Sequence, residues 1–90
     1  MHLRGVIQTA VLEETPPDSG NIEMVIRVQG VGPGQPRRLV LPYALLLQDE
    51  SLEPDAVAGR AFDADVEQDE QQRWVVQTIA FAGRVLRAPD

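Results

Sequence analysis

One short apolar run, LVLPYALLLQDE over Leu39–Glu50, most constrains what this 90-residue chain can fold into. Its first part reads as a strand, and Pro42 ends that strand because proline has no N–H to donate to a sheet. The proline also suits the first turn of a helix, in which Tyr43, Leu46 and Leu47 share one stripe. The sequence therefore predicts one short apolar helix in a chain whose other segments resemble strands.

The segments before the helix are predicted to be three strands. Val, Ile and Thr are frequent in Leu3–Glu14, where Gly5 indicates a bulge or a tight bend. Ile22–Gln29 alternates as a half-buried strand does. Arg37–Pro42 is the third strand, and it follows a glycine-rich loop. The side chains expected to face the core from the second strand are Ile22, Met24, Ile26 and Val28.

Two further strands are expected after the helix. Ser51 and Gly59 are suited to begin and end an additional helical turn before them. Arg60–Val66 alternates, with an inner face of Phe62, Ala64 and Val66. Both faces of Arg73–Phe81 are semi-apolar, so two registers stay open. The inward set is either Trp74, Val76, Thr78 and Ala80 or Val75, Gln77, Ile79 and Phe81.

The order of three strands, a helix and two strands resembles the oligonucleotide/oligosaccharide-binding (OB) fold, a five-stranded Greek-key barrel. The resemblance covers Leu3 to about Leu86 and rests on element order rather than on a motif. It implies an all-β, OB-like barrel with one short helix between strands 3 and 4, which plugs the open end of the barrel. We expect a single domain over residues 1–90, with an ordered core from about residue 3 to residue 87.

Composition argues against several classes of function. The chain has no cysteine, hence no disulfide or thiolate chemistry. No apolar stretch approaches the ~20 residues of a membrane span, and the N-terminus lacks a signal-peptide pattern, so we expect a cytoplasmic protein without membrane contact. The single histidine, His2, is terminal, and no nucleophile lies next to a base. We therefore expect no enzymatic activity, no cofactor and no metal site.

The formal net charge is −6, and the acidic residues concentrate in one segment. Asp49–Glu70 holds nine acids against one arginine, a balance of −8, whereas the rest of the chain is slightly basic. An acidic surface steers a partner by electrostatic complementarity. We therefore expect a small non-enzymatic binding module, an accessory subunit or adaptor for a protein partner. The residues expected to form its interaction surface are Asp63, Asp65, Glu67, Asp69 and Glu70.

Binding of single-stranded DNA or RNA is the alternative, because strands two and three carry the usual ligand face of the fold that the chain resembles. Such ligands need basic side chains and aromatic platforms, and no aromatic residue lies between Ile22 and Leu41. The overall acidity also opposes phosphate binding. The side chains of this alternative are Arg27, Arg37, Arg38 and Trp74.

The apolar residues near the C-terminus leave a homodimer open. Ile79, Phe81, Val85 and Leu86 complete the core if they are all inside, and otherwise they form an apolar contact patch. We favour the core, because a domain of this size needs its large apolar residues inside.

Overall fold

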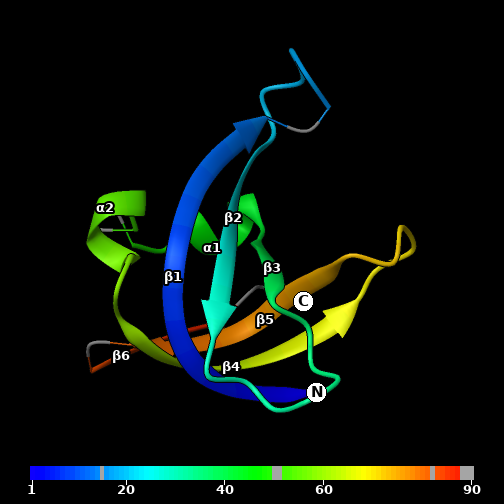
Figure 1. The fold of residues 1–90 in the computed structure, drawn as a ribbon. Helices are drawn as coiled ribbons and strands as arrows, with labels where there is room; N and C mark the ends of the chain where they lie inside the picture. The colour runs from blue at the N-terminus through cyan, green and yellow to red at the C-terminus, as the bar shows by residue number, and fades with distance from the viewer. Residues whose placement is uncertain (15, 50–51, 82, 88–90) are drawn as a thin grey trace.

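The structure is a computed structural model that describes the chain apart from residues 15, 50–51, 82 and 88–90, so the expected cap at Ser51 lies outside the described residues. The described residues form six strands and two short helices, whose arrangement Figure 1 shows, coloured from the N-terminus to the C-terminus. In chain order they are β1 (His2–Glu14), β2 (Ile22–Gln29), β3 (Arg38–Leu41), α1 (Tyr43–Leu46), α2 (Pro54–Val57), β4 (Ala61–Gln68), β5 (Trp74–Phe81) and β6 (Arg84–Arg87).

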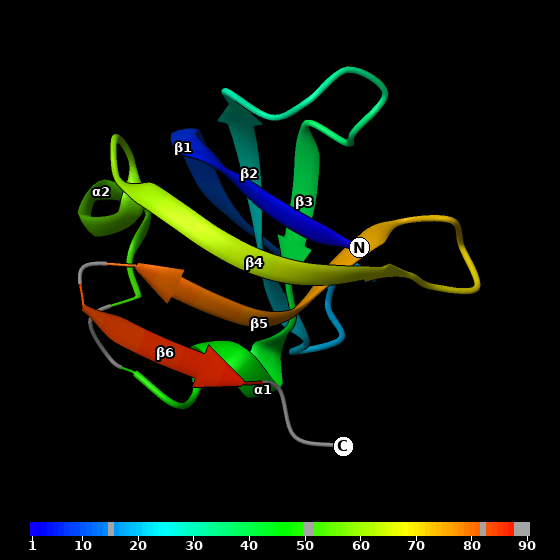
Figure 2. The same ribbon diagram turned by 90° about the horizontal axis from the view of Figure 1, so that it is seen from below.

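Five of these strands close into a barrel. The sheet runs in the order β3-β2-β1-β4-β5-β6, and β3 also pairs with β5, in parallel, at Val40 and Val75. This last pairing joins the two sides of the sheet, as the view from below shows (Figure 2). The predicted fold class is confirmed: an all-β barrel of five strands, with small helical pieces only between strands 3 and 4.

β1 changes partner along its length. Its first residues pair with β4 as far as Val6, and from Val6 onward it pairs with β2. Gln8 is an extra residue in the pairing with β2, a bulge that bends the strand between its two partners. At Gly5 the backbone of Gln29 comes so close that a Cβ atom would overlap its carbonyl oxygen. The bulge thus lies three residues after the glycine, and the glycine itself permits the close approach of the two backbones.

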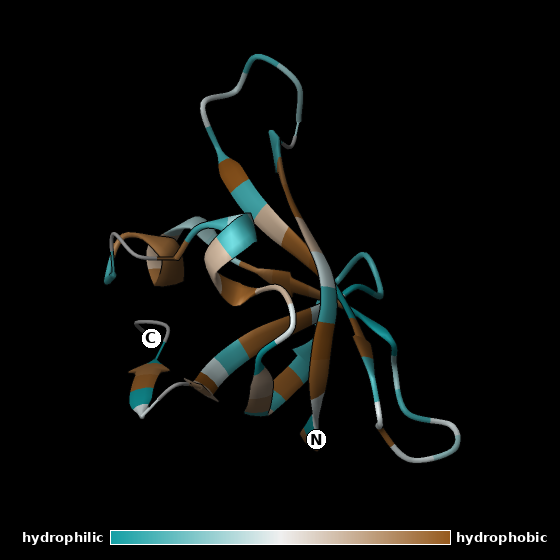
Figure 3. Cartoon of the chain, turned by 60° about the vertical axis from the view of Figure 1, so that its left-hand side comes forward, coloured by the Kyte–Doolittle hydropathy of each residue, from teal (hydrophilic) through white to brown (hydrophobic). Residues whose placement is uncertain are grey.

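Aliphatic side chains, one methionine and two phenylalanines fill the barrel, and the alternation of hydrophobic and hydrophilic segments along the strands can be followed in Figure 3. The inner face predicted for β4 is confirmed, as is that of β2 except at Ile22. Ile22 pairs with Glu14 at the far end of the β1–β2 hairpin, where it is partly exposed. The fully enclosed core residues include Leu3, Ile7, Met24, Ile26, Leu39, Leu41, Leu45, Val57, Val66, Val76 and Ile79.

The register of β5 combines the two predicted alternatives. Trp74 and Val76 face the interior in its first half, whereas Ile79 and Phe81 do so in its second half. The switch occurs because the pairing with β4 skips one residue of β5, Gln77. A bulge of this kind reverses which residues of a strand point inward. A strict period of two could therefore not describe the whole strand.

The helical connection differs from the expected stripe. Leu45 of α1 is fully buried and Leu46 is partly buried, but Tyr43 and Leu47 are 41% and 66% exposed. The expectation that Tyr43 and Leu47 cap the core is wrong, because a helix of one turn directs few side chains toward the barrel. Leu45 takes that place as the chain leaves β3 and packs on β2.

A second helical piece, α2, contributes the buried side chain of Val57, and Gly59 follows it with a positive φ of +84°. The glycine suits the left-handed conformation that commonly ends a helix. Across the described residues, no helix is long or apolar enough to cross a bilayer.

The C-terminal segment forms a sixth strand outside the barrel. β6 pairs with the second half of β5, which buries Leu86 and leaves Val85 exposed. The side chain of Gln48 brackets the other edge of β6: its amide nitrogen donates to the carbonyl of Arg87, and its amide oxygen accepts from the N–H of the same residue. An ion pair between Arg84 and Asp49 lies beside this contact. The expected inward position therefore holds for Leu86 but not for Val85.

The close approach at Gly5 predicts a specific loss of stability. Gly5→Ala should lower the free energy of unfolding by about 1–3 kcal/mol, because the new methyl group forces the backbone of Gln29 away. Gly32→Ala is the matched control, since the nearest side chain there is the flexible Gln35, and it should change stability by less than about 0.5 kcal/mol. Chemical denaturation of both variants checks this, and equal losses would contradict it.

The orientation of α1 predicts opposite results for two neighbouring leucines. Leu45→Ala should destabilise the protein by about 2–5 kcal/mol, because it leaves a cavity at the base of the barrel. Leu47→Ala should lie within about 0.5 kcal/mol of the parent, because the side chain is largely in solvent. Thermal and urea unfolding measure both, and a larger loss at Leu47 would show that α1 packs with the other face inward.

Candidate functional site

The acidic residues of β4 are on the outer face of the barrel, opposite basic residues of β1. Asp63 pairs with Arg4 across the two strands, and Asp65 pairs with His2. The Arg4 Nε atom lies 2.8 Å from Asp63 Oδ2, and His2 Nδ1 lies 2.8 Å from Asp65 Oδ1. His2 Nε2 also contacts Asp63 Oδ1. Two of the five acids of the expected interaction surface are thus neutralised within the molecule.

These contacts shift the pKa values of His2 and Asp63. The hydrogen bond with Asp65 is the main cause that raises the pKa of His2 above 6.5, and the charges of Asp63 and Asp65 add to it against the effect of desolvation. The hydrogen bond from Arg4 is the main cause that lowers the pKa of Asp63, with His2 adding to it. The charged forms of these side chains therefore stabilise one another.

A third acid, Asp69, belongs to another network at the turn between β4 and β5. Arg73 Nε lies 3.0 Å from Asp69 Oδ2, and Arg73 Nη1 lies 3.0 Å from Oε1 of Glu23 on β2. Partial desolvation raises the pKa of Asp69, but the hydrogen bonds from Arg73 and from the backbone of Gln71 outweigh it and lower the pKa. Glu23 is only 6% exposed, so Arg73 supplies the counter-charge that its burial requires.

The expected acidic surface is therefore divided. Asp63, Asp65 and Asp69 have basic partners within the chain, whereas Glu67 and Glu70 are exposed and have none among the residues that the structure describes. The described side chains contain no group of three or more His, Asp or Glu that is arranged to hold a metal ion.

Two of the three arginines of the alternative, Arg27 and Arg38, lie on the outer face of β2 and β3, whereas Arg37 lies one residue before β3, at a position that alternates with Arg38. Arg27 and Arg38 are directly opposite each other in the pairing of the two strands, and Arg37 precedes Arg38. All three are exposed, and the nearest acid is Glu13, whose Oε2 lies 4.0 Å from Arg38 Nη2. Trp74 is not part of this group, because its side chain packs against the core.

A row of valines crosses the same outer face. Val11 pairs with Val25, Val25 with Val40, and Val40 with Val75, so the row spans β1, β2, β3 and β5. Val25 and Val40 are 8% and 2% exposed although they point away from the core, whereas Val11 is 51% exposed. Arg27 and Arg38 lie two residues from the row on one side, and Glu23 with Arg73 borders it on the other.

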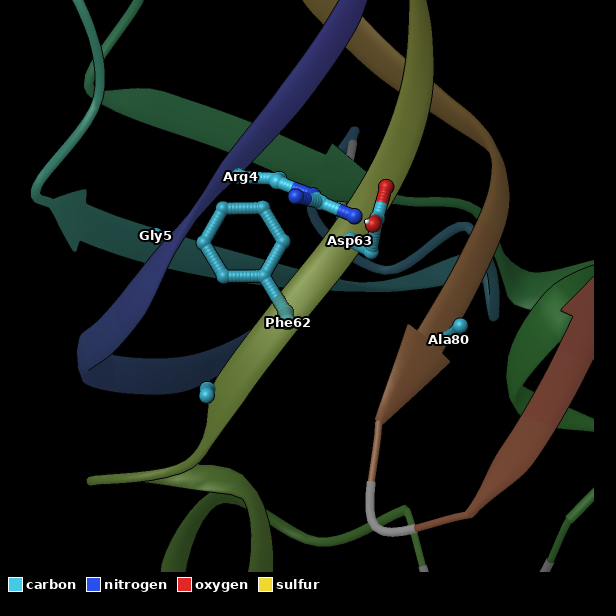
Figure 4. Close-up of a pocket in the computed structure, with 6 residues that line it drawn as sticks. Arg4, Gly5, Phe62, Asp63 and Ala80 are labelled. Atoms are coloured by element: carbon cyan, nitrogen blue, oxygen red, sulfur yellow. Dashed lines mark hydrogen bonds and ion pairs between the residues drawn. The ribbon is translucent and has the colours of Figure 1, made fainter.

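A hollow of about 410 Å³ lies between β1, β4 and β5 (Figure 4). Its charged groups, Arg4 and Asp63, are paired with each other, and the rest of its lining is glycine, alanine and the ring of Phe62. Of the described residues, Asp63 is the one carboxylate in this lining, and it is engaged by Arg4.

Part of this face is visible in the sequence and part is not. The alternation in Ile22–Gln29 and Arg37–Pro42 already puts Val25, Val40, Arg27 and Arg38 on outward positions. The pairing of Arg27 with Arg38, the partners of the acids and the burial of Glu23 depend on strand register between distant segments, for which the sequence holds no local signal.

The cluster at the start of β1 predicts a pH effect. Because the pKa of His2 is raised in the folded state, its contribution to stability is complete below about pH 6.5 and is lost as the pH rises through the raised pKa. Asp65→Asn should bring the pKa of His2 back toward 6.5 and remove most of this pH dependence. A histidine titration by NMR, with unfolding followed across the same pH range, measures both. An unchanged pKa in the variant would contradict the assigned cause.

Comparisons of the chain with protein-family models, with curated proteins and with solved structures found no match. The site is thus characterised by its own side chains: an outer face with a valine row at its centre, two exposed arginines on one side, and on the other an ion-pair network of Arg73 with the two carboxylates of Glu23 and Asp69.

Proposed function

We propose that this protein is a small non-enzymatic module that binds another protein in the cytoplasm. The barrel is of the OB type in this proposal, since five strands in a Greek-key arrangement with a helical insertion after the third are typical of it. The contact surface is the outer face of β2 and β3 with the neighbouring part of β1.

The valine row with its charged borders is the observation that carries the proposal. Protein interfaces commonly combine an apolar centre with a polar rim. Val11 offers an exposed aliphatic side chain at one end of the row, and Val25 and Val40 form a packed floor beside it. The ion pair of Glu23 and Arg73 holds one border in place, so the face is a fixed surface rather than a set of independent side chains.

The acidic surface keeps a smaller part in this proposal. Glu67 pairs with Val75 across β4 and β5, so it borders the end of the valine row. Glu70 is exposed in the adjoining turn. These two carboxylates remain available to a partner, whereas Asp63, Asp65 and Asp69 would first have to leave their own basic partners.

The nucleic-acid alternative retains the arginines but loses its aromatic platform. Stacking of bases on aromatic rings supplies ~1–3 kcal/mol per base in proteins that bind single strands. Trp74 packs against the core, and the outward positions of β2 and β3 carry valine, glutamate, glutamine and arginine. A net charge of −6 further weakens attraction to phosphates. These features favour a protein over a nucleic acid as the partner.

Site-specific photo-crosslinking tests the proposal. A photoreactive residue at Val11 should link the protein to one partner in cells of its source organism, because the exposed position 11 lies at the edge of the contact face. The matched control is the same residue at Val85, a still more exposed valine on β6, which should give no such product. Equal products from both positions, or none from Val11, would refute the surface. A product sensitive to nuclease would favour the alternative.

A further inference from the structure

Resting on the proposed function, we propose that Arg27 and Arg38 bind carboxylates of an acidic, aliphatic segment of the protein partner. The segment lies extended along β2 and β3. Its acidic side chains contact the two arginines, and its aliphatic side chains contact Val11 and Val75, the members of the valine row that are not buried.

Arg27 and Arg38 are directly opposite each other in the pairing of β2 with β3. Like charges directly opposite each other on a sheet destabilise it. On β1 the neighbour of Arg27 is the uncharged Thr9, and the nearest acid, Glu13, is 4.0 Å from Arg38. Two opposed positive charges thus share one counter-ion at 4.0 Å, an arrangement that a bound anion would relieve.

Most of the other arginines have a polar partner within the chain. Arg4, Arg73 and Arg84 each form an ion pair with an aspartate or a glutamate, and the Arg60 side chain donates to the carbonyl of Ala56. Among the described residues the Arg87 side chain has no such partner, but it does not lie opposite a second arginine. The chain has 14 acids for 8 arginines, so counter-charges are plentiful. In the part of the chain that the structure describes, the side chains of Arg27 and Arg37 have no such partner.

The distance between the arginines and the valines defines the ligand. Arg27 is two residues from Val25 on the same face of β2, and Arg38 is two residues from Val40 on β3. Two residues of a strand span roughly 6–7 Å. An extended segment has the same spacing, so one with an acid and an aliphatic residue two positions apart meets an arginine and the valine row together. Arginine clusters are a recurring means of recognising acidic motifs.

The aliphatic side chains of the valine row favour a peptide that carries carboxylates over a nucleic acid that carries phosphates. A peptide places an apolar side chain at every second position, which suits Val11 and Val75. A single-stranded nucleic acid instead presents bases, which bind aromatic platforms that this face lacks.

Fluorescence anisotropy with synthetic probes tests the proposal. The probe is a labelled peptide of about eight residues in which Glu and Val stand two positions apart with Ser between them, so that both lie on one face of the extended chain. Two further probes are the same peptide with Lys in place of Glu and a labelled oligodeoxythymidine of similar length. The parent protein should bind the Glu peptide most tightly, and the binding should weaken with salt.

The double variant Arg27→Gln, Arg38→Gln should weaken binding of the Glu peptide by roughly tenfold or more. Its thermal midpoint should stay equal or rise, because the substitution removes the repulsion between the two side chains. Arg87→Gln is the matched control, since Arg87 is an exposed arginine on β6, and it should leave binding unchanged. A lower midpoint would indicate a structural role for the arginine pair instead.

Three results would overturn the inference: equal binding of the Glu and Lys peptides, equal effects of the double variant and Arg87→Gln, or tighter binding of the oligonucleotide than of any peptide. Absence of binding by all probes at low salt would also overturn it. A partner that crosslinks at Val11 and still binds the double variant would leave the proposed function standing without this inference.

Discussion

The sharing of β1 between β2 and β4 is the constraint on which the rest of the barrel depends. A strand can serve both sheets only if it bends, and the bulge at Gln8 and the absence of a side chain at Gly5 permit the bend. The bend brings β4 and β5 around until β5 reaches β3 and the circle closes. Closure removes most free strand edges, which a small barrel would otherwise expose.

The sequence predicts the parts of this fold that follow from local alternation. On β2 and β4 one side of the strand is apolar and the other is not, so the inner face follows directly. β5 could not be predicted in this way, because both of its faces are semi-apolar and the bulge at Gln77 exchanges them midway. The helix failed for another reason: within YALLL every position is apolar or aromatic, and only the tertiary contact with β2 selects Leu45.

Local alternation along the sequence predicts even less of the candidate site. A run of acids along the chain looks like a single charged surface, but folding pairs Asp63 with Arg4, 59 residues away, and Glu23 with Arg73, 50 residues away. Conversely, the arginines are separated by a loop in the sequence and become direct neighbours only through the register of β2 and β3. Which charges remain for a partner is therefore decided by strand pairing rather than by composition.

The two hydrogen bonds between the Gln48 side chain and the backbone of Arg87 connect β6 to the segment that follows α1. The Gln48 amide occupies both backbone groups of Arg87, while Asp49 pairs with Arg84 at the other end of the same strand. If β6 detaches, Gln48 and Asp49 lose these contacts as well. We therefore expect β6 and the residues just after α1 to open together, independently of the closed barrel.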